Sequence, residues 1–405
     1  MSAPPDPLDW MDLPDGHRLA IVADGPARSA LPMADGIRRA RPGDGTSAAV
    51  LKMLAAQPKE RQFGNFRVRS WTARAADGER PMNVDQTNES VIVGDAAVVK
   101  WAIHLQEGPH PAPRRITALR AAGFAGMPEP WGLITWQPPD RAETVAAYVD
   151  EYLPGAVDGW TWAVEVMTGA TLEQDPDASV ATARQLGVLV AEMHDALAST
   201  ASTATSGDAD RWHTAALATL ETACALSESE SVLVLRTRRE EVAAELSILS
   251  SLTGTAVIDG HGDLHVGQIL RSGEKLFVTD FDGNPVLTAP ERMYPIPAVV
   301  DVAGMVQSLA HVAIVARRYT ELDPGELHAV ESTTRRVFLE SYTARLREAG
   351  HGHLVDPRPL RALRLIQVMR EMIYAAQHLP RWMYVPDAAL PALLDDPAPP
   401  DEERQ

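Results

Sequence analysis

The sequence predicts an α+β fold in which a strand-rich N-terminal part is followed by a larger helical part. Up to about residue 153, apolar residues fall in short runs bounded by turn residues, which is typical of strands. After Pro154 they recur at helical spacing instead, as in "VATARQLGVLVAEMHDAL". At 405 residues and 45% hydrophobic, the chain is too long for one ordinary core, so several packed units are expected.

The elements divide the chain into three expected domains. Residues 1–80 form an N-terminal cap of short strands, with a helix from about Ser47 to Ala56. Residues 81–153 supply a small antiparallel sheet: "ESVIVG" and "AAVVKWAIH" pair as a hairpin, a helix covers "ITALRAAGF", and "WGLITWQ" and "ETVAAYVDEYL" are strands. Residues 154–405 form a helical lobe.

Composition limits the classes of partner. With 37 basic against 55 acidic residues, the net charge of −18 argues against binding to nucleic acid or an anionic membrane. Cys224 is the only cysteine, which excludes an intrachain disulfide and a thiolate zinc cluster. The N-terminus lacks the features of a signal peptide, and "VAGMVQSLAHVAIVA" contains Gln307 and His311, which interrupt a clean membrane span. We therefore expect a cytoplasmic protein.

The polar stretch "VIDGHGDLHVGQIL" is the strongest chemical signal. It could be a metal site, a phosphoryl-transfer loop or a polar turn. Downstream, "QILR" and "LFVTDFD" flank "SGEK", so they should pair as a hairpin that turns near Gly273 and places Gln268 opposite Asp280. In an extended strand, Asp280 and Asp282 would point to one face. A glutamine carbonyl and two carboxylates form a hard oxygen site of the kind that Mg²⁺ prefers.

Asp263 precedes Gln268 by five residues and can lie beside such a metal without binding it. This is the position of a carboxylate that accepts a hydroxyl proton and orients the oxygen for attack. A zinc site built from His261 and His265 is an alternative, although the Gln and the two Asp residues favour a hard oxygen site. His194 is expected to be a packed or capping histidine.

Several motifs in the same order resemble the aminoglycoside-phosphotransferase superfamily of kinases, most closely its maltokinase branch and their glucosamine-kinase relatives. The resemblance covers most of the chain and is carried by "HGDLHVGQIL", "VTDFDGNP", "DVAGM", "DQTNESVIVGDAAVVKW", "YVDEYLPGAVDGWTWA", "LGVLVAEMHDAL" and "RWMYVP". It implies a bilobal protein-kinase-like fold with a small antiparallel-sheet N-lobe, an N-terminal cap and a mostly helical C-lobe. It also implies a monomeric, ATP- and Mg²⁺-dependent kinase of a small-molecule sugar.

The resemblance assigns roles residue by residue. Asp263 matches the catalytic aspartate, Gln268 and Asp280 match the metal ligands, and Asp282 matches an acid that can join them. Lys100 matches the lysine that neutralises the α- and β-phosphates of ATP, and the backbone at Glu151 and Leu153 matches the adenine contacts of the hinge.

The chain departs from the family pattern at two points. The helix glutamate that should pair with Lys100 falls near Arg114, which leaves two alternatives: Glu107 substitutes for it, or the lysine is held by another group. Maltokinases tend to have an arginine before the aspartate of "DVAGM", where this chain has Val300.

The acceptor site is expected on "LIQVMREMIYAAQHLPRWMYVP". This stretch resembles a maltokinase helix with two Tyr-Glu pairs, of which Glu371 keeps one glutamate and Ala375 replaces the other. Tyr374 and Trp382 offer flat faces to a sugar, although a Trp in this setting is as often a packing residue. The expected substrate site therefore consists of Asp263, His265, Glu371, Tyr374 and Trp382.

The altered helix and "DFDGNP" favour phosphorylation of glucosamine at O6. The alternatives are a maltokinase that makes maltose 1-phosphate, a catalytically silent kinase-fold binding module and a metal-dependent hydrolase.

Overall fold

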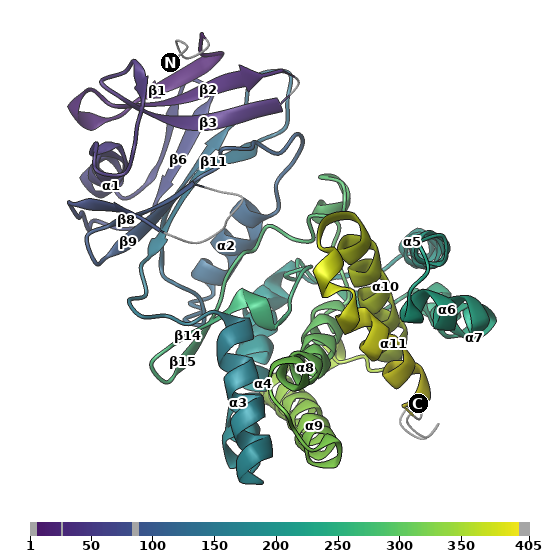
Figure 1. Cartoon of the computed structure of the whole chain (residues 1–405). Helices are drawn as coiled ribbons and strands as arrows, with labels where there is room; N and C mark the ends of the chain where they lie inside the picture. The colour runs from purple at the N-terminus through teal and green to yellow at the C-terminus, as the bar shows by residue number, and fades with distance from the viewer. Residues whose placement is uncertain (1–5, 26, 83–88, 397–405) are drawn as a thin grey trace. The chain divides into compact units, whose positions relative to one another are not determined.

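The computed structural model describes residues 6–25, 27–82 and 89–396 (Figure 1). Contacts between Cα atoms divide the chain into two compact units. The sheet unit comprises Met1–Ala121, Met127–Ala156 and Phe281–Tyr294, and the helical unit comprises Ala122–Gly126, Val157–Asp280 and Pro295–Gln405. The three domains expected from the sequence stay a prediction.

The described part of the sheet unit contains two antiparallel sheets. The first has the order β1-β2-β3-β4, with β1 at Asp9–Asp12, β2 at Arg18–Asp24, β3 at Ala27–Ala34 and β4 at Arg38–Arg39. The second has the order β5-β6-β10-β11-β9-β8-β7. Its strands are β5 Glu60–Phe63, β6 Phe66–Ser70, β7 Glu79–Pro81, β8 Glu89–Val93, β9 Ala97–Trp101, β10 Pro130–Trp136 and β11 Thr144–Glu151.

Helix α1 (Thr46–Ala56) lies beside the strands of the sheet unit (Figure 1). It shares one hydrophobic core with both sheets, in which Trp101 and Trp131 are buried. All seven residues of β10 are buried, because α1 and α2 (Ala112–Ala121) help to cover this sheet. The predicted hairpin is β8–β9, and the predicted helix at Ser47–Ala56 is α1. Lys100 on β9 lies directly opposite Tyr148 on β11.

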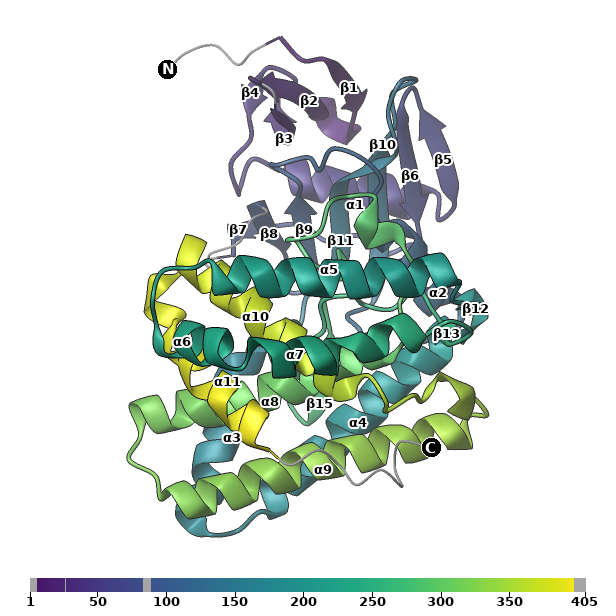
Figure 2. The same ribbon diagram turned by 90° about the vertical axis from the view of Figure 1, so that its right-hand side faces the viewer.

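The helical unit is built from nine helices within the described residues. They are α3 Gly159–Glu173, α4 Asp177–Leu197, α5 Ser206–Cys224, α6 Glu230–Thr237, α7 Arg239–Leu246, α8 Val299–Tyr319, α9 Pro324–Glu348, α10 Leu360–His378 and α11 Tyr384–Asp395. Helix α4 packs along α9, and α5 lies beside α10 (Figure 2). The start of α9 is encoded locally, because Asp323 accepts hydrogen bonds from the Gly325 and Glu326 backbone NH groups and Pro324 occupies the first turn.

Helix α8 is the central helix of this unit and contacts α3, α9, α10 and α11. It is long and apolar enough to cross a membrane by length and mean hydropathy alone. However, 78% of its apolar window is buried inside the protein, as is typical of a core helix.

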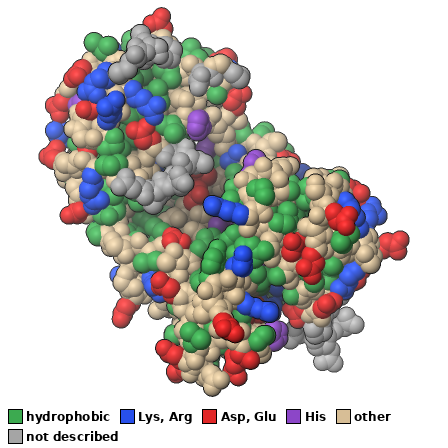
Figure 3. Space-filling model, viewed as in Figure 1, with side chains coloured by type: hydrophobic (Ala, Val, Ile, Leu, Met, Phe, Trp, Pro, Cys, Tyr) green, Lys and Arg blue, Asp and Glu red, His purple; other side chains and the backbone are tan. Residues whose placement is uncertain are grey.

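On the face shown in Figure 3, basic side chains lie among acidic ones.

The predicted hairpin before the candidate site is present, and both its strands belong to the helical unit. β14 (Ile269–Ser272) pairs with β15 (Lys275–Val278), and the turn at Gly273 and Glu274 is the one expected from "SGEK". However, β15 ends at Val278 and Asp280 has φ +66°, in the left-handed region. The alternation of an extended strand therefore does not reach Asp280 and Asp282, and the expectation that it sets their directions was wrong.

Candidate active site

The loop that contains Asp263 is anchored to the first turn of α8. The carboxylate of Asp301 accepts hydrogen bonds from the backbone NH groups of His261 and Gly262, each at 2.7 Å. Although burial raises the pKa of Asp301, hydrogen bonds from His194 and the Gly262 NH help to hold it below the usual range. An ionised carboxylate thus fixes the backbone of the loop.

His194 on α4 contacts the Asp301 carboxylate that anchors the loop. It is fully buried, and its ring nitrogens lie 3.1 Å from Asp301 Oδ2 and 2.9 Å from the Tyr342 hydroxyl. The expectation of a packed histidine is confirmed.

Two further residues on the same stripe of α8 receive the loop. A Cβ on Gly304 would lie 2.2 Å from the carbonyl oxygen of Leu264, so only glycine allows this approach. One helical turn further, the Ser308 hydroxyl accepts a hydrogen bond of 2.9 Å from the Val266 NH. The loop therefore lies against the helix at three successive turns.

The His261 ring joins the loop to the hairpin. Its Nε2 donates to the Thr279 carbonyl oxygen at 3.0 Å, and its Nδ1 accepts from the Asp263 NH at 3.3 Å. Because both ring nitrogens are used in this way, His261 is a bracing residue in this structure and the zinc alternative loses one of its two ligands.

Gln268 and Asp280 meet at the open end of the hairpin, as the sequence predicted. The Gln268 amide nitrogen lies 3.3 Å from Asp280 Oδ2, and Thr279 binds the Gln268 carbonyl oxygen through its NH at 2.9 Å. Among the described residues no group of three or more His, Cys, Asp or Glu side chains could hold a metal. An amide oxygen and one carboxylate nevertheless fit Mg²⁺, which takes its other ligands from phosphates and water.

Asp263 has the electrostatics of a proton acceptor. Burial, and to a lesser extent the Asp280 carboxylate, raise the pKa of Asp263 to about 7, although the Arg370 guanidinium opposes both effects. A carboxylate with a pKa near the working pH can both accept and release a proton. Burial also lowers the pKa of His265, which favours its neutral form.

Asp282 and Lys100 belong to the sheet unit. Asp282 accepts a hydrogen bond of 2.5 Å from the Tyr148 hydroxyl, and Arg115 on α2 donates to the neighbouring Phe281 carbonyl oxygen at 2.9 Å. Lys100 lies 3.3 Å from Asp150 Oδ2. Glu107, the expected substitute partner, lies instead 3.0 Å from Arg28 and 3.1 Å from Arg141, so that expectation was wrong.

The expected hinge residues lie at the end of β11, with Glu151 as its last residue and Leu153 just beyond it. The Glu151 NH binds the Glu129 carbonyl oxygen at 2.8 Å, and within the described parts of the chain no acceptor takes the Leu153 NH. That NH is thus available to an adenine. The expected phosphate-loop segment "DQTNES" lies outside the described residues except for Glu89 and Ser90.

The expected acceptor residues form part of an aromatic cluster in the helical unit. Trp382 lies 5.5 Å from Trp160 and 5.9 Å from Tyr384, and Trp160 lies 6.3 Å from His265 (ring centroids). Glu371 on α10 contacts His311 at 3.1 Å. Tyr374 is 46% exposed and contacts only His378 among the rings of the described residues.

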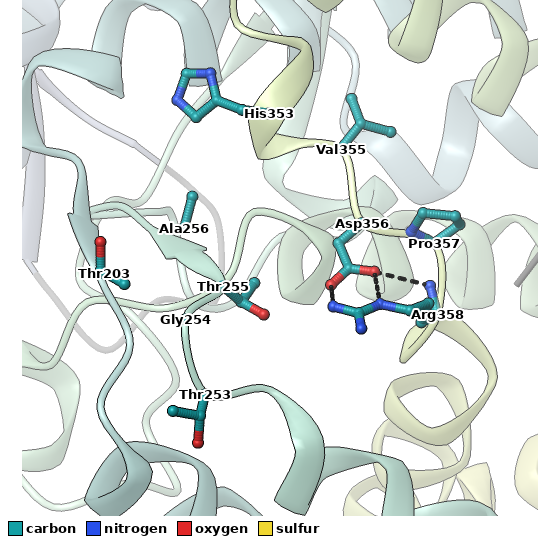
Figure 4. Close-up of a pocket in the computed structure, with 10 residues that line it drawn as sticks. All are labelled: Thr203, Thr253, Gly254, Thr255, Ala256, His353, Val355, Asp356, Pro357 and Arg358. Carbon is teal, nitrogen blue, oxygen red and sulfur yellow. Dashed lines mark hydrogen bonds and ion pairs between the residues drawn. The ribbon is translucent and has the colours of Figure 1, made fainter. Parts of the chain in front are cut away.

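A separate cavity of about 610 Å³ in the helical unit is lined by none of the expected site residues (Figure 4). Its two charged side chains, Asp356 and Arg358, bind each other at 2.6 and 2.8 Å. It therefore presents no uncompensated charge to a ligand.

Sequence reasoning missed four contributors: Asp301 as the anchor, Arg370, Trp160 and His311. Arg370 could have been found, because it precedes Glu371 on a helix already assigned to the acceptor. Asp301 lies in the "DVAGM" motif and Trp160 in "YVDEYLPGAVDGWTWA", but the contacts of these two residues and of His311 are with partners distant in the sequence, such as His261, Trp382 and Glu371.

Comparisons with known proteins find relatives that match almost the whole chain. No established protein-family profile matches it. A glucosamine kinase of Mycolicibacterium smegmatis is 58% identical over 96% of this chain and 98% of its own length. A glucosamine kinase of Streptacidiphilus jiangxiensis is 43% identical over 95% of this chain and 90% of its own.

A solved glucosamine kinase in complex with glucosamine, ADP and inorganic phosphate superposes with a TM-score of 0.86 at 39% identity, and covers 97% of this chain and 95% of that one. A second crystal form of a glucosamine kinase gives a TM-score of 0.87. The protein-kinase-like fold is thereby confirmed, and the chain belongs to the glucosamine kinase family.

Proposed function

We propose that this protein is an ATP-dependent glucosamine kinase that produces glucosamine 6-phosphate and ADP. The observation that carries the proposal is the 58% identity with a glucosamine kinase over 98% of that protein. The solved relative bound to glucosamine, ADP and phosphate supports both the acceptor and the donor. The anchored loop and the Gln268–Asp280 pair supply the chemistry that such a transfer needs.

In the proposed reaction, the glucosamine O6 forms a bond to the γ-phosphorus of ATP while the bond to the ADP oxygen breaks. Asp263 accepts the O6 proton and orients the oxygen for in-line attack. Gln268 and Asp280 would hold Mg²⁺, with Asp282 as a further acid, and this ion would neutralise the phosphate oxygens. Lys100 would bind the α- and β-phosphates, and the backbone of Glu151 and Leu153 the adenine.

We further propose that the protein acts as a monomer in the cytoplasm, where ATP is abundant. Its strong net negative charge of −18 is compatible with an acceptor that carries an ammonium group.

The proposal predicts how activity depends on pH. Because the pKa of Asp263 is raised to about 7, its carboxyl group is protonated at lower pH and cannot accept the O6 proton, so kcat/KM falls on the acidic side. Arg370→Gln removes the positive charge that opposes this rise, and should move the acidic limb to higher pH, whereas Arg370→Lys should leave it in place. Bound Mg²⁺ lowers the pKa of Asp263, so all pH–rate profiles are compared at one metal concentration. If the acidic limb of the pH–rate profile lay at the same pH in Arg370→Gln as in the unmutated protein, the assignment of this limb to Asp263 would be contradicted.

Glu371 is proposed to bind the glucosamine ammonium. A charge-assisted contact of this kind is worth about 1.5–3 kcal/mol. Glu371→Gln should therefore raise KM for glucosamine about 10- to 100-fold, with KM for ATP changed less than about twofold, and should narrow the preference for glucosamine over glucose. Steady-state kinetics with both sugars measure this, and a variant with unchanged KM for glucosamine would remove Glu371 from the acceptor site.

The acceptor is tested by a screen for ADP release with glucosamine, glucose, N-acetylglucosamine, maltose and aminoglycosides. We expect glucosamine to give the highest kcat/KM. Equal turnover of glucose and glucosamine would refute the amino-sugar assignment, robust turnover of maltose would favour the maltokinase alternative, and no ADP release with any acceptor would favour a silent binding module.

A further inference from the structure

The carboxylate of Glu371 has two neighbours in the helical unit. Gln367, one turn earlier on α10, donates from its amide to Glu371 Oε1 at 3.2 Å. The second oxygen, Oε2, lies 3.1 Å from Nδ1 of His311, which comes from α8. His311 is fully buried, whereas the Glu371 side chain keeps 22% of its surface exposed and can reach a ligand.

A chain of hydrogen bonds behind His311 determines which of its nitrogens carries the proton. The Arg364 guanidinium, which can only donate, gives a hydrogen bond of 3.0 Å from Nε to the Gln307 side-chain oxygen. The oxygen of the Gln307 amide is thus turned toward Arg364, and its NH₂ group must face His311.

The Gln307 amide nitrogen lies 2.9 Å from Nε2 of His311. Because the NH₂ group is the donor, Nε2 must be the acceptor and carries no proton. The proton of the neutral ring is therefore on Nδ1, the nitrogen that faces Glu371. Protonation of Nε2 would set two donors against each other in a buried place.

The contact between His311 and Glu371 is close but not well aligned. Within the described residues neither His311 Nδ1 nor Glu371 Oε2 has a hydrogen bond of good geometry, although both atoms are buried. A buried polar atom without a partner costs about 1–3 kcal/mol. The separation of 3.1 Å between these two atoms is already within hydrogen-bond range, so the contact lacks only the alignment.

We propose that His311 is a positioning residue that donates from Nδ1 to Glu371, and that Arg364 and Gln307 enforce this tautomer. The inference rests on the proposed function for the identity of the group that Glu371 binds. With a neutral imidazole as its partner, Glu371 keeps its full negative charge for the ammonium of the sugar. An imidazolium at the same place would cancel that charge, and the site would lose its preference for an amine.

Two variants of His311 form a matched pair. In His311→Asn the amide nitrogen replaces Nδ1, so the donor to Glu371 is kept and the contact with Gln307 is lost. In His311→Gln the amide replaces Nε2, so the contact with Gln307 is kept and the donor to Glu371 is lost. Each variant gives up one buried hydrogen bond, and a purely structural role would therefore make the two lower the melting temperature and the activity alike.

We expect His311→Gln to raise KM for glucosamine about tenfold and to reduce the preference for glucosamine over glucose, with KM for ATP unchanged. His311→Asn should remain within about twofold of the unmutated protein in all three quantities. Equal changes in the two variants, or an unchanged KM in His311→Gln, would overturn the inference.

Neutron diffraction from crystals of the unmutated protein tests the tautomer without any variant or activity. We expect a deuteron on Nδ1 of His311 and none on Nε2, and a deuteron on Nε2 would refute the proposed relay. Failure of the proposed function has a different signature, since the unmutated protein would then phosphorylate glucose as well as glucosamine.

Discussion

We expect Asp263→Asn to lower kcat by about 10²–10⁴-fold, the range typical for loss of a general base. The amide cannot accept the O6 proton, although it occupies nearly the same volume as the carboxylate. The loop should keep its shape, because it is held by the Asp301 carboxylate and by the backbone NH of residue 263, not by the Asp263 side chain. KM for ATP should therefore change less than about twofold.

Single-turnover and steady-state measurements with glucosamine test this expectation. Asp210→Asn on α5 is the matched control. It removes the same charge from an exposed aspartate of the same unit that lies outside the candidate site. Turnover of Asp263→Asn within a few-fold of the unmutated protein would exclude the assigned role.

Asp280→Asn is expected to lower activity at least about 10²-fold even at high Mg²⁺, because it removes the only carboxylate beside Gln268 at the open end of the described hairpin. Asparagine tolerates the left-handed backbone at this position better than most residues do, so the change tests charge and not folding. Gln268→Ala should have a smaller effect, because a neutral oxygen contributes less to cation binding than a carboxylate.

Titration of activity with Mg²⁺ after chelation gives the apparent metal affinity of each variant. Full activity of Asp280→Asn at millimolar Mg²⁺ would contradict the ligand assignment. Recovery of the unmutated protein by Zn²⁺ but not by Mg²⁺ would contradict the hard oxygen site itself.

Local patterns predicted the elements correctly. The "SGEK" turn between two apolar runs specified the hairpin and its register, and hence the meeting of Gln268 with Asp280. The rule of alternation failed two residues beyond the strand, because the left-handed conformation of Asp280 redirects the chain and no sequence period encodes it.

Long-range partners were the other failure. The sequence offered Glu107 or an unspecified group as the partner of Lys100. In the structure Asp150 contacts the lysine from the neighbouring strand, across a pairing that only the folded sheet creates. His311 and Gln307 looked like interruptions of an apolar helix. Their structural role depends on contacts with Arg364 and Glu371, which lie more than 50 residues away in the sequence.

Helix α8 contacts both the loop that contains Asp263 and the carboxylate of Glu371 along one stripe, through Asp301, Gly304, Ser308 and His311. A rigid helix that serves as the common reference for two sites cannot be altered for one of them alone. We therefore expect substitutions on α10 to change the preference for the acceptor without disturbing the Asp263 loop, whereas a substitution on this stripe of α8 affects the loop and Glu371 together.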